Sequence, residues 1–473
     1  MIKKIIFLLL LCGIILSGSA QNKIWTMQEC VDYALKNNIQ IKQSEIATEI
    51  SEHQQTQSFY NMFPSLNGSG SYSYNRGRSV DPTTYRYTTQ DVQAANLSLN
   101  TNVVLFNGFQ LQNELKQSKL DYMSGKYDLD KIKNDISLNV AAAYLQVLYN
   151  EEQLGAQTDR VDAAKKQTDR TKILVDAGTL PKGSFLDAEA QLATEELSKV
   201  NFENQLANSY LTLTQLLELE TTEGFTVEKP KIEIPDQASV TLPPAEIFKI
   251  SLTSQPEIKS SEYKVQSAEK GLSIAKGSTW PRLSLFGSWG TNYSDQSQNL
   301  TQTIDKGLQP NGSYTQSGEP IYSQSYDFIL EDTPFSDQAN DNLNKSFGFS
   351  LSVPIFNGLS ANTNVKRARL NLENAKYSSE LTKNQLYKSI QQAHTDAVAA
   401  LNRYKAADKS VAALTESFTY TEKKYNAGLL TSIDYTTARN NLTKSESDML
   451  QAKYDFIFRL KVLDFYMGKP LVY

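Results

Sequence analysis

Four short segments of the chain alternate between apolar and polar residues. In the clearest of them, 347–355, large apolar residues occupy every second position, with glycine or serine at most positions between. Segment 97–106 has the same period of two, with leucine, threonine and valine set against serine and asparagine. This period predicts strands with one apolar and one polar face. The four predicted strands lie at about residues 65–75, 96–106, 281–292 and 346–356.

Two much longer stretches carry a helical pattern. No proline interrupts the chain from Phe109 to about Gly178, and the stretch 359–427 matches it in length. At about 1.5 Å per residue, roughly 70 residues span about 100 Å, which exceeds a globular domain and predicts a coiled coil. The seams with spacings of three and four are Val140, Ala143, Val147, Asn150, Leu154, Gln157 and Val161, and Ile390, Ala393, Ala397, Ala400, Tyr404, Ala407 and Val411.

Each long helix is predicted to end in a glycine turn, at Ala177-Gly178 and at Ala427-Gly428. Glycine accepts the left-handed conformation that ends many helices. Ser184 and Asp434, each six residues after its glycine, are predicted to cap the returning helices. The returning helices have seams at Leu186, Ala190, Ala193, Leu197, Val200, Asn204, Ala207 and Leu211, and at Tyr435, Ala438, Leu442, Ser445, Met449, Ala452 and Phe456.

These elements occur twice in one order, which indicates an internal repeat. Phe106-Asn107-Gly108 reappears 250 residues later as Phe356-Asn357-Gly358, and Gly178 and Gly428 have the same offset. Before the strands the offset is 217, so one half holds 33 additional residues after position 292. Their serine, glutamine, asparagine, tyrosine and glycine predict an enlarged loop. The predicted repeats are residues 21–227 and 245–473, joined by a linker at 228–244.

The first 20 residues have the features of a signal peptide. Lys3 and Lys4 precede an apolar run at 5–16, and small residues follow, with cleavage expected after Ala20. The apolar run is short for a membrane-spanning helix, which disfavours the alternative of an uncleaved anchor. No later stretch holds 18 consecutive apolar residues, so entry into a membrane would require strands closed into a barrel.

Four strands are too few to close such a barrel alone, since small barrels have about eight. Copies of the chain would therefore have to share one barrel. Two alternatives remain open from periodicity alone. The strands also suit a soluble β-sandwich with one solvated face, and the helices suit a solvated antiparallel bundle.

Charge and motifs give no sign of catalysis. Loss of Lys3 and Lys4 with the leader takes the formal net charge from −5 to −7, so no basic face for nucleic acid is expected. Cys30 is then the one remaining cysteine, which precludes an internal disulfide. We find no metal-ligand spacing, phosphate-binding loop, dinucleotide fingerprint or nucleophile elbow. We therefore expect no enzyme, no cofactor and no metal, with energy for any transport supplied by a partner.

The sequence resembles the TolC-like outer-membrane efflux protein family. The resemblance rests on the duplicated order, on PIFNG at 354–358 with its variant VLFNG at 104–108, and on YNAGLLTSIDYTTARNNL at 425–442. It implies a mainly α fold with a β-barrel portion: a homotrimer with a twelve-stranded barrel in outer-membrane lipid of a Gram-negative bacterium and a periplasmic helical tunnel. It also implies the exit duct of a tripartite efflux or type I secretion system, docked on a periplasmic adaptor and, through it, an inner-membrane transporter.

The resemblance assigns roles to the turns. It places adaptor contacts at Ala177-Gly178-Thr179 and Ala427-Gly428-Leu429, and a constriction at Asp434 and Tyr425. The family pattern is broken at Leu430, Ser184 and Thr437, where an arginine and two aspartates are expected.

Asp434 therefore has two interpretations: one carboxylate of a ring on the channel axis, or only a helix cap. The competing functional hypotheses are a periplasmic coiled-coil adaptor or scaffold without a channel, and an exported enzyme. The cargo, the adaptor and the energy source of the pump are not encoded in any motif that we find.

Overall fold

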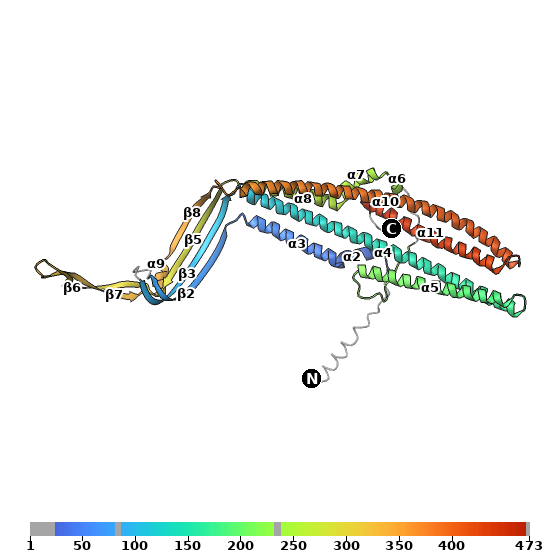
Figure 1. Cartoon of the computed structure of the whole chain (residues 1–473), viewed down its shortest axis with the longest axis horizontal. Coiled ribbons are helices and arrows are strands. Elements are labelled where there is room, and N and C mark those ends of the chain that lie inside the picture. Colours follow the sequence, from blue (N-terminus) through green and yellow to red (C-terminus); the bar gives the residue numbers. More distant parts are fainter. Residues whose placement is uncertain (1–23, 81–86, 231–237, 470–473) are drawn as a thin grey trace, which may run out of the picture. The chain divides into compact units, whose positions relative to one another are not determined.

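The computed structural model describes residues 24–80, 87–230 and 238–469, and its elements are labelled in Figure 1. The predicted signal peptide and residues 231–237 of the predicted linker lie outside this part of the chain. The chain forms two compact units, each drawing on both predicted repeats. Unit 1 comprises Met1–Glu52, Leu120–Gln266 and Glu373–Tyr473, and unit 2 comprises His53–Lys119 and Ser267–Leu372.

Eight helices form four pairs of equal length. In order they are α2 (Met27–Asn37), α3 (Ile39–Tyr60), α4 (Gln110–Asp176), α5 (Lys182–Leu216), α7 (Pro244–Ser254), α8 (Pro256–Gly277), α10 (Ser360–Asn426) and α11 (Ser432–Tyr466). Helices α2 and α3 recur 217 residues later as α7 and α8, and α4 and α5 recur 250 residues later as α10 and α11. The long pair, α4 and α10, has 67 residues each. No helix among the described residues has the length and apolar character needed to cross a membrane.

Unit 1 has two apolar cores, and α11 contributes to both. Tyr454 and Ile457 join a core built mainly from α2, α4 and α5, whereas Phe456 and Leu460 join one built mainly from α7, α8 and α10. At the first core, β1 (Ile24–Trp25) pairs in parallel with β4 (Thr226–Val227), and the Tyr144 hydroxyl donates to the Glu228 carbonyl at 2.8 Å. The short helix α6 (Ala238–Thr241) brings Val240 to the second core.

The predicted helical seams have two different outcomes. The seams of α10 and α11 are confirmed, since their residues are buried or half-buried. The α4 seam is confirmed by the same criterion, and Gln153 and Arg160 beside it are buried as well. The α5 seam is wrong for the single chain, because all eight of its residues are exposed, with Leu197 at 63%.

Unit 2 contains a four-stranded antiparallel sheet in the order β2-β3-β5-β8. Its strands are β2 (Ser65–Val80), β3 (Tyr87–Phe106), β5 (Arg282–Ser294) and β8 (Asn344–Ser352). The first two are longer than predicted. The last ends at Ser352 instead of near 356, and Pro354, which has no N–H to donate, follows at once.

The register of the sheet sorts its side chains onto two chemically different faces. Opposed residues share a face, so the pairs Leu99↔Trp289 and Leu285↔Phe349 lie on one side, with Phe347 and Leu351. The pairs Ser69↔Ser98 and Ser288↔Ser346 lie on the other side. One face is therefore rich in large apolar residues, and the other is rich in serine and asparagine.

The enlarged loop predicted after residue 292 is wrong. This segment forms a second, two-stranded sheet from β6 (Gln298–Tyr314) and β7 (Pro320–Asp332), followed by the helix α9 (Phe335–Asp341). Polar composition favoured a loop, but leucine, isoleucine, phenylalanine and tyrosine recur along both strands. Breaks in register between Leu300 and Gln302 and between Asp305 and Leu308 interrupt the alternation that would have revealed them.

Candidate functional site at the hairpin tips

The two glycine turns of unit 1 have the same backbone geometry. Gly178 and Gly428 have φ of 72° and 76°. At the first tip, Gly178 N–H donates to the Val175 carbonyl and Thr179 N–H to the Leu174 carbonyl, both at 2.9 Å. The second tip repeats both bonds 250 residues later. This pair of bonds is the Schellman motif, in which glycine relieves the strain of the left-handed residue.

Both tips present their predicted docking residues to solvent. Ala177, Gly178 and Thr179 are exposed at the first tip, as are Ala427, Gly428 and Leu429 at the second. Leu429 is 73% exposed and Ile433, close by on α11, is 71% exposed. Large apolar side chains this exposed, clustered at a turn, are typical of a surface that contacts another protein.

The prediction that Ser184 caps α5 is wrong, and the one for Asp434 needs correction. The N-cap of α5 is Pro181, and Ser184 lies inside the first turn of the helix. The N-cap of α11 is Thr431, and Asp434 is the third helical residue of a capping box. Asp434 Oδ2 accepts from the Thr431 hydroxyl at 2.7 Å and from the Thr431 N–H at 3.2 Å. The Thr-x-x-Asp spacing at 431–434 was the sequence signal for this box.

Tyr425 is half-buried and contacts both helical hairpins of its own chain. Its hydroxyl accepts a hydrogen bond from Gln167 Nε2 at 3.1 Å, and its ring stacks on Tyr435 with centroids 4.7 Å apart. Burial raises the pKa of the Tyr435 hydroxyl, so Tyr435 stays neutral at physiological pH. One turn nearer the tip, Arg170 donates to Asn426 Oδ1 at 2.9 Å. These contacts hold the last turns of α4 and α10 together.

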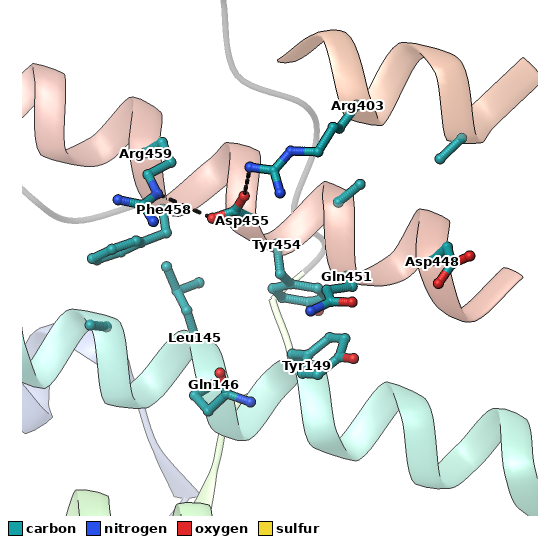
Figure 2. Close-up of a pocket in the computed structure, with 13 residues that line it drawn as sticks. Leu145, Gln146, Tyr149, Arg403, Asp448, Gln451, Tyr454, Asp455, Phe458 and Arg459 are labelled. Atoms are coloured by element: carbon teal, nitrogen blue, oxygen red, sulfur yellow. Dashed lines mark hydrogen bonds and ion pairs between the residues drawn. The ribbon is translucent and has the colours of Figure 1, made fainter. Parts of the chain in front are cut away.

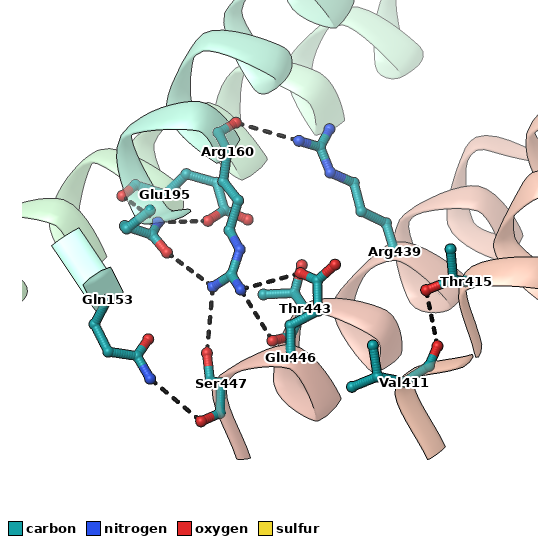
Figure 3. Close-up of polar contacts among 10 residues, drawn as sticks. Gln153, Arg160, Glu195, Val411, Thr415, Arg439, Thr443, Glu446 and Ser447 are labelled. Carbon is teal, nitrogen blue, oxygen red and sulfur yellow. Dashed lines mark hydrogen bonds and ion pairs between the residues drawn. The ribbon is translucent and has the colours of Figure 1, made fainter. Parts of the chain in front are cut away.

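A buried arginine that sequence reasoning missed connects α4 to α11 (Figure 3). The Arg160 side chain is 10% exposed. Its guanidinium donates to the Thr443 carbonyl at 3.1 Å, to Glu446 Oε2 at 3.3 Å and to Ser447 Oγ at 3.5 Å. A buried charge is stable only when paired and hydrogen-bonded, and this arginine has both kinds of partner.

The contacts of Arg160 continue into α5. Gln157 Oε1 accepts from Arg160 at 3.2 Å, and Gln157 Nε2 donates to Glu195 Oε2 at 2.7 Å. Arg439 Nη2 donates to the Arg160 carbonyl at 3.2 Å. Arg439 is therefore turned toward α4. It does not replace the arginine that the family pattern expects at position 430, where this chain has Leu430. Thr437, another position at which the family pattern is broken, is exposed.

Farther from the tips, a hollow of about 710 Å³ lies between α4, α10 and α11 (Figure 2). Tyr149 and Tyr454 form part of its wall, with ring centroids 6.1 Å apart. Asp455 neutralises two cations there, accepting from Arg403 at 2.8 Å and from Arg459 at 3.2 Å. The ion pair between Arg403 and Asp455 thus joins α10 to α11 at this hollow.

The described residues offer no group of three or more histidine, cysteine, aspartate or glutamate side chains that is suited to a metal ion. The chemistry concentrated at the tips is instead hydrogen bonding between helices, exposed apolar surface and exposed carboxylates that include Asp434. Such a site can contact another protein and attract cations.

Comparisons with known proteins agree on one family. The family model described as outer membrane efflux protein matches residues 30–218 and 248–469. The outer membrane efflux protein BepC of Brucella suis is 21% identical over 451 residues, covering 95% of this chain and 86% of that protein. The outer membrane protein TolC of Escherichia coli is 22% identical over 454 residues, covering 95% and 83%.

Solved structures give the same fold. The CmeC outer membrane channel of Campylobacter jejuni superposes with a TM-score of 0.72 at 18% identity, covering 95% of this chain and 86% of that one. The outer membrane protein VceC of Vibrio cholerae superposes with a TM-score of 0.73 at 13% identity, covering 94% and 96%. The predicted fold class, mainly α with a strand portion of this channel type, is confirmed.

Proposed function

Since the chain belongs to the outer membrane efflux protein family and is thus an outer-membrane channel protein, we propose that three copies form one continuous exit duct. The duct carries cargo passively from a periplasmic adaptor and an inner-membrane transporter to the outside of the cell. The observation that carries this proposal is the two-faced sheet of unit 2, which has an open edge on each side. A scaffold without a channel has no use for such a sheet.

The sheet has the chemistry of one third of a barrel wall. Strands β2 and β8 each have a partner on one side only among the described residues, so one protomer leaves two edges unpaired. An open edge is not tolerated in lipid, and pairing β2 of one copy with β8 of the next removes every edge. The apolar face then contacts lipid and the serine and asparagine face lines the lumen.

The exposed seam of α5 supports the same assembly. Its apolar residues, Leu186, Leu197, Val200 and Leu211, have spacings that suit a coiled coil but contact no helix of their own chain closely enough to be buried. A seam of this kind is stable only against another helix. We assign it to the contact with the neighbouring copy. The periplasmic tunnel is then a closed ring of six hairpins.

Leu197→Asp is expected to weaken the trimer. The change removes an apolar side chain from the seam at each of three contacts, costing about 2 kcal/mol per contact, and adds a desolvated charge. Light scattering on the protein in detergent should give three times the protomer mass for the wild type and a lower mass for the variant. Glu196→Gln, at the neighbouring exposed position, is the control and should leave the mass unchanged. A variant mass equal to that of the wild type contradicts the proposed seam.

The tips are proposed to bind the adaptor. Their small residues, Ala177, Gly178, Ala427 and Gly428, allow a partner helix to approach the backbone closely. Leu429 and Thr179 then provide one apolar and one hydrogen-bonding contact. The family resemblance and the exposure of all six tip residues support this assignment.

Asp434 and Tyr425 are proposed to form the periplasmic constriction. In a trimer, three Asp434 carboxylates face one axis and attract cations. Tyr425 sets the position of the second hairpin through its contacts with Gln167 and Tyr435. Asp434 can have both roles. Its hydrogen bonds with Thr431 need only a carboxylate oxygen, whereas attraction of cations to the constriction needs the negative charge.

Asp434→Asn separates the two roles. Asparagine keeps an acceptor oxygen but removes the charge, so under a salt gradient the reversal potential of the channel should move toward zero while the thermal midpoint stays close to that of the wild type. Asp434→Ala should also lose the half of the capping box that the Asp434 carboxylate makes, the hydrogen bonds accepted from Thr431, at up to about 1 kcal/mol per copy. Asp187→Asn, another exposed aspartate early in a returning helix, is the control. Unchanged selectivity in Asp434→Asn would leave Asp434 as a cap alone.

A further inference from the structure

The β6–β7 hairpin is the feature that the duct does not explain. Most of its large apolar side chains lie on one face, because opposed residues share a face and the pairs Leu300↔Leu330 and Pro310↔Tyr322 lie on the same side as Tyr326 and Phe328. The leucine, tyrosine and phenylalanine side chains of this group are all exposed. We call this the aromatic face. The opposite face carries Asn299, Glu331 and Ser323 together with Ile304 and Ile329, and it has no aromatic residue among its paired positions.

The hairpin is firmly attached at its base. Gln338 of α9, only 2% exposed, donates to the carbonyls of Ser294 and Thr333 at 2.9 and 2.8 Å and accepts from the Ser294 N–H at 3.0 Å. Asp295 pairs with Gln93 of β3 through its N–H and its carboxylate. Hydrogen bonds thus fix the base of the hairpin to the four-stranded sheet. Figure 1 shows the hairpin continuing from the end where β5 meets α9.

A two-stranded hairpin is marginally stable alone in water, so an exposed aromatic face calls for a partner. Charge disfavours an anionic lipid surface as that partner. Residues 298–332 hold five acidic residues and one lysine, Lys306, which is paired with Asp327. Binding to such a surface relies on clustered basic residues.

Chain order favours the other copies of this chain. Along the chain the hairpin lies between β5 and β8, with α9 after β7, and β8 is the edge strand proposed to pair with the next copy. Strands of 13 to 17 residues reach about 40 Å or more, whereas a barrel of twelve strands about 4.8 Å apart and tilted by about 40° is roughly 25 Å across. Each hairpin is long enough to cross the mouth.

We propose that the three β6–β7 hairpins of a trimer meet through their aromatic faces and form a lid over the outer mouth of the duct. The proposal rests on the proposed trimeric duct. The partner of each aromatic face is the same face of the other two copies. The lid closes the outer mouth of the barrel, independently of the tips.

Phe328→Cys tests the contact, with Ser323→Cys on the opposite face of the same strand as control. Intact cells are treated with a short, membrane-impermeant bis-maleimide; buried Cys30 stays unreactive, so the wild type is the blank. Cross-linked dimers and trimers are expected for Phe328→Cys only. Replacing 298–332 by a short glycine-serine linker should raise the open fraction or conductance in a bilayer roughly twofold.

The outcomes are distinct. A conducting trimer in which Phe328→Cys does not cross-link between copies, and in which the shortened variant behaves like the wild type, overturns the lid but leaves the duct intact. Equal cross-linking by both cysteine variants also overturns it, since the contact is then not confined to the aromatic face. A protein that forms no trimer overturns the duct and the lid together.

Discussion

Gly108→Ala is expected to abolish assembly, whereas Gly358→Ala, the same change in the second copy of the Phe-Asn-Gly motif, is expected to be tolerated. The two glycines have φ of 64° and 61°, so an added methyl group meets the same backbone strain at both, about 1–2 kcal/mol. They differ in the space around them. A Cβ at Gly108 would lie 2.4 Å from the Gly277 carbonyl oxygen and 2.8 Å from Trp280 Cβ. A Cβ at Gly358 meets nothing within 4 Å in the protomer.

The close approach at Gly108 lies where the end of β3 passes the end of α8. The obstructing atoms are mostly backbone, which cannot swing aside as a long side chain can. The change must therefore push the strand-to-helix junctions of the two repeats apart, which adds about 1–3 kcal/mol or more in every copy. A junction displaced in this way also misplaces the sheet that three copies have to close.

The measurement is the amount of trimer in outer-membrane fractions, with thermal midpoints for whatever protein is recovered. We expect little trimer from Gly108→Ala and near-normal amounts from Gly358→Ala. Equal yields and equal midpoints for the two variants would contradict the close packing of Gly108 against Gly277 and Trp280.

Leu99→Arg is expected to remove the protein from the outer membrane, and Asn100→Arg is not. The two residues are neighbours on β3 but lie on opposite faces of the sheet, Leu99 opposite Trp289 and Asn100 opposite Ser288. Arginine on a lipid face costs about 2–4 kcal/mol near the middle of the bilayer, and the trimer carries three copies. The same arginine on the luminal face stays in water.

Quantifying trimer after carbonate extraction of membranes tests this pair. Leu99→Arg should be degraded or recovered outside the membrane. Asn100→Arg should insert, with its effect confined to conductance and ion selectivity. Insertion of both variants, or loss of Asn100→Arg alone, would mean that the faces of the sheet are assigned the wrong way round.

Much of the fold was readable because its signals are local and repeated. The spacing of Gly178 and Gly428 gives the offset that the helix bounds reproduce, and the alternation at 97–106 gives β3 its two faces. Alanines at three- and four-residue spacings were enough to place the α10 seam. Periodicity and turn chemistry determine these features, and each appears twice in the chain.

Other features depend on partners that no local pattern reveals. From the sequence, Arg160 would be taken for a solvated charge on a helix. It is buried because Thr443, Glu446 and Ser447, on a helix far later in the chain, contact it. The α5 seam was predicted correctly in spacing but finds no partner within one copy. Capping at Thr431 was visible in its spacing with Asp434 and was assigned to the wrong residue of that pair.

The most direct test of the trimeric duct is the current of the purified protein in a planar bilayer. A trimeric duct should give discrete conductance steps of one size from a protein with three times the protomer mass, with a preference for cations that depends on Asp434. A protein that inserts no conducting unit and leaves membranes on washing with carbonate would contradict it and would indicate a helical scaffold without a channel.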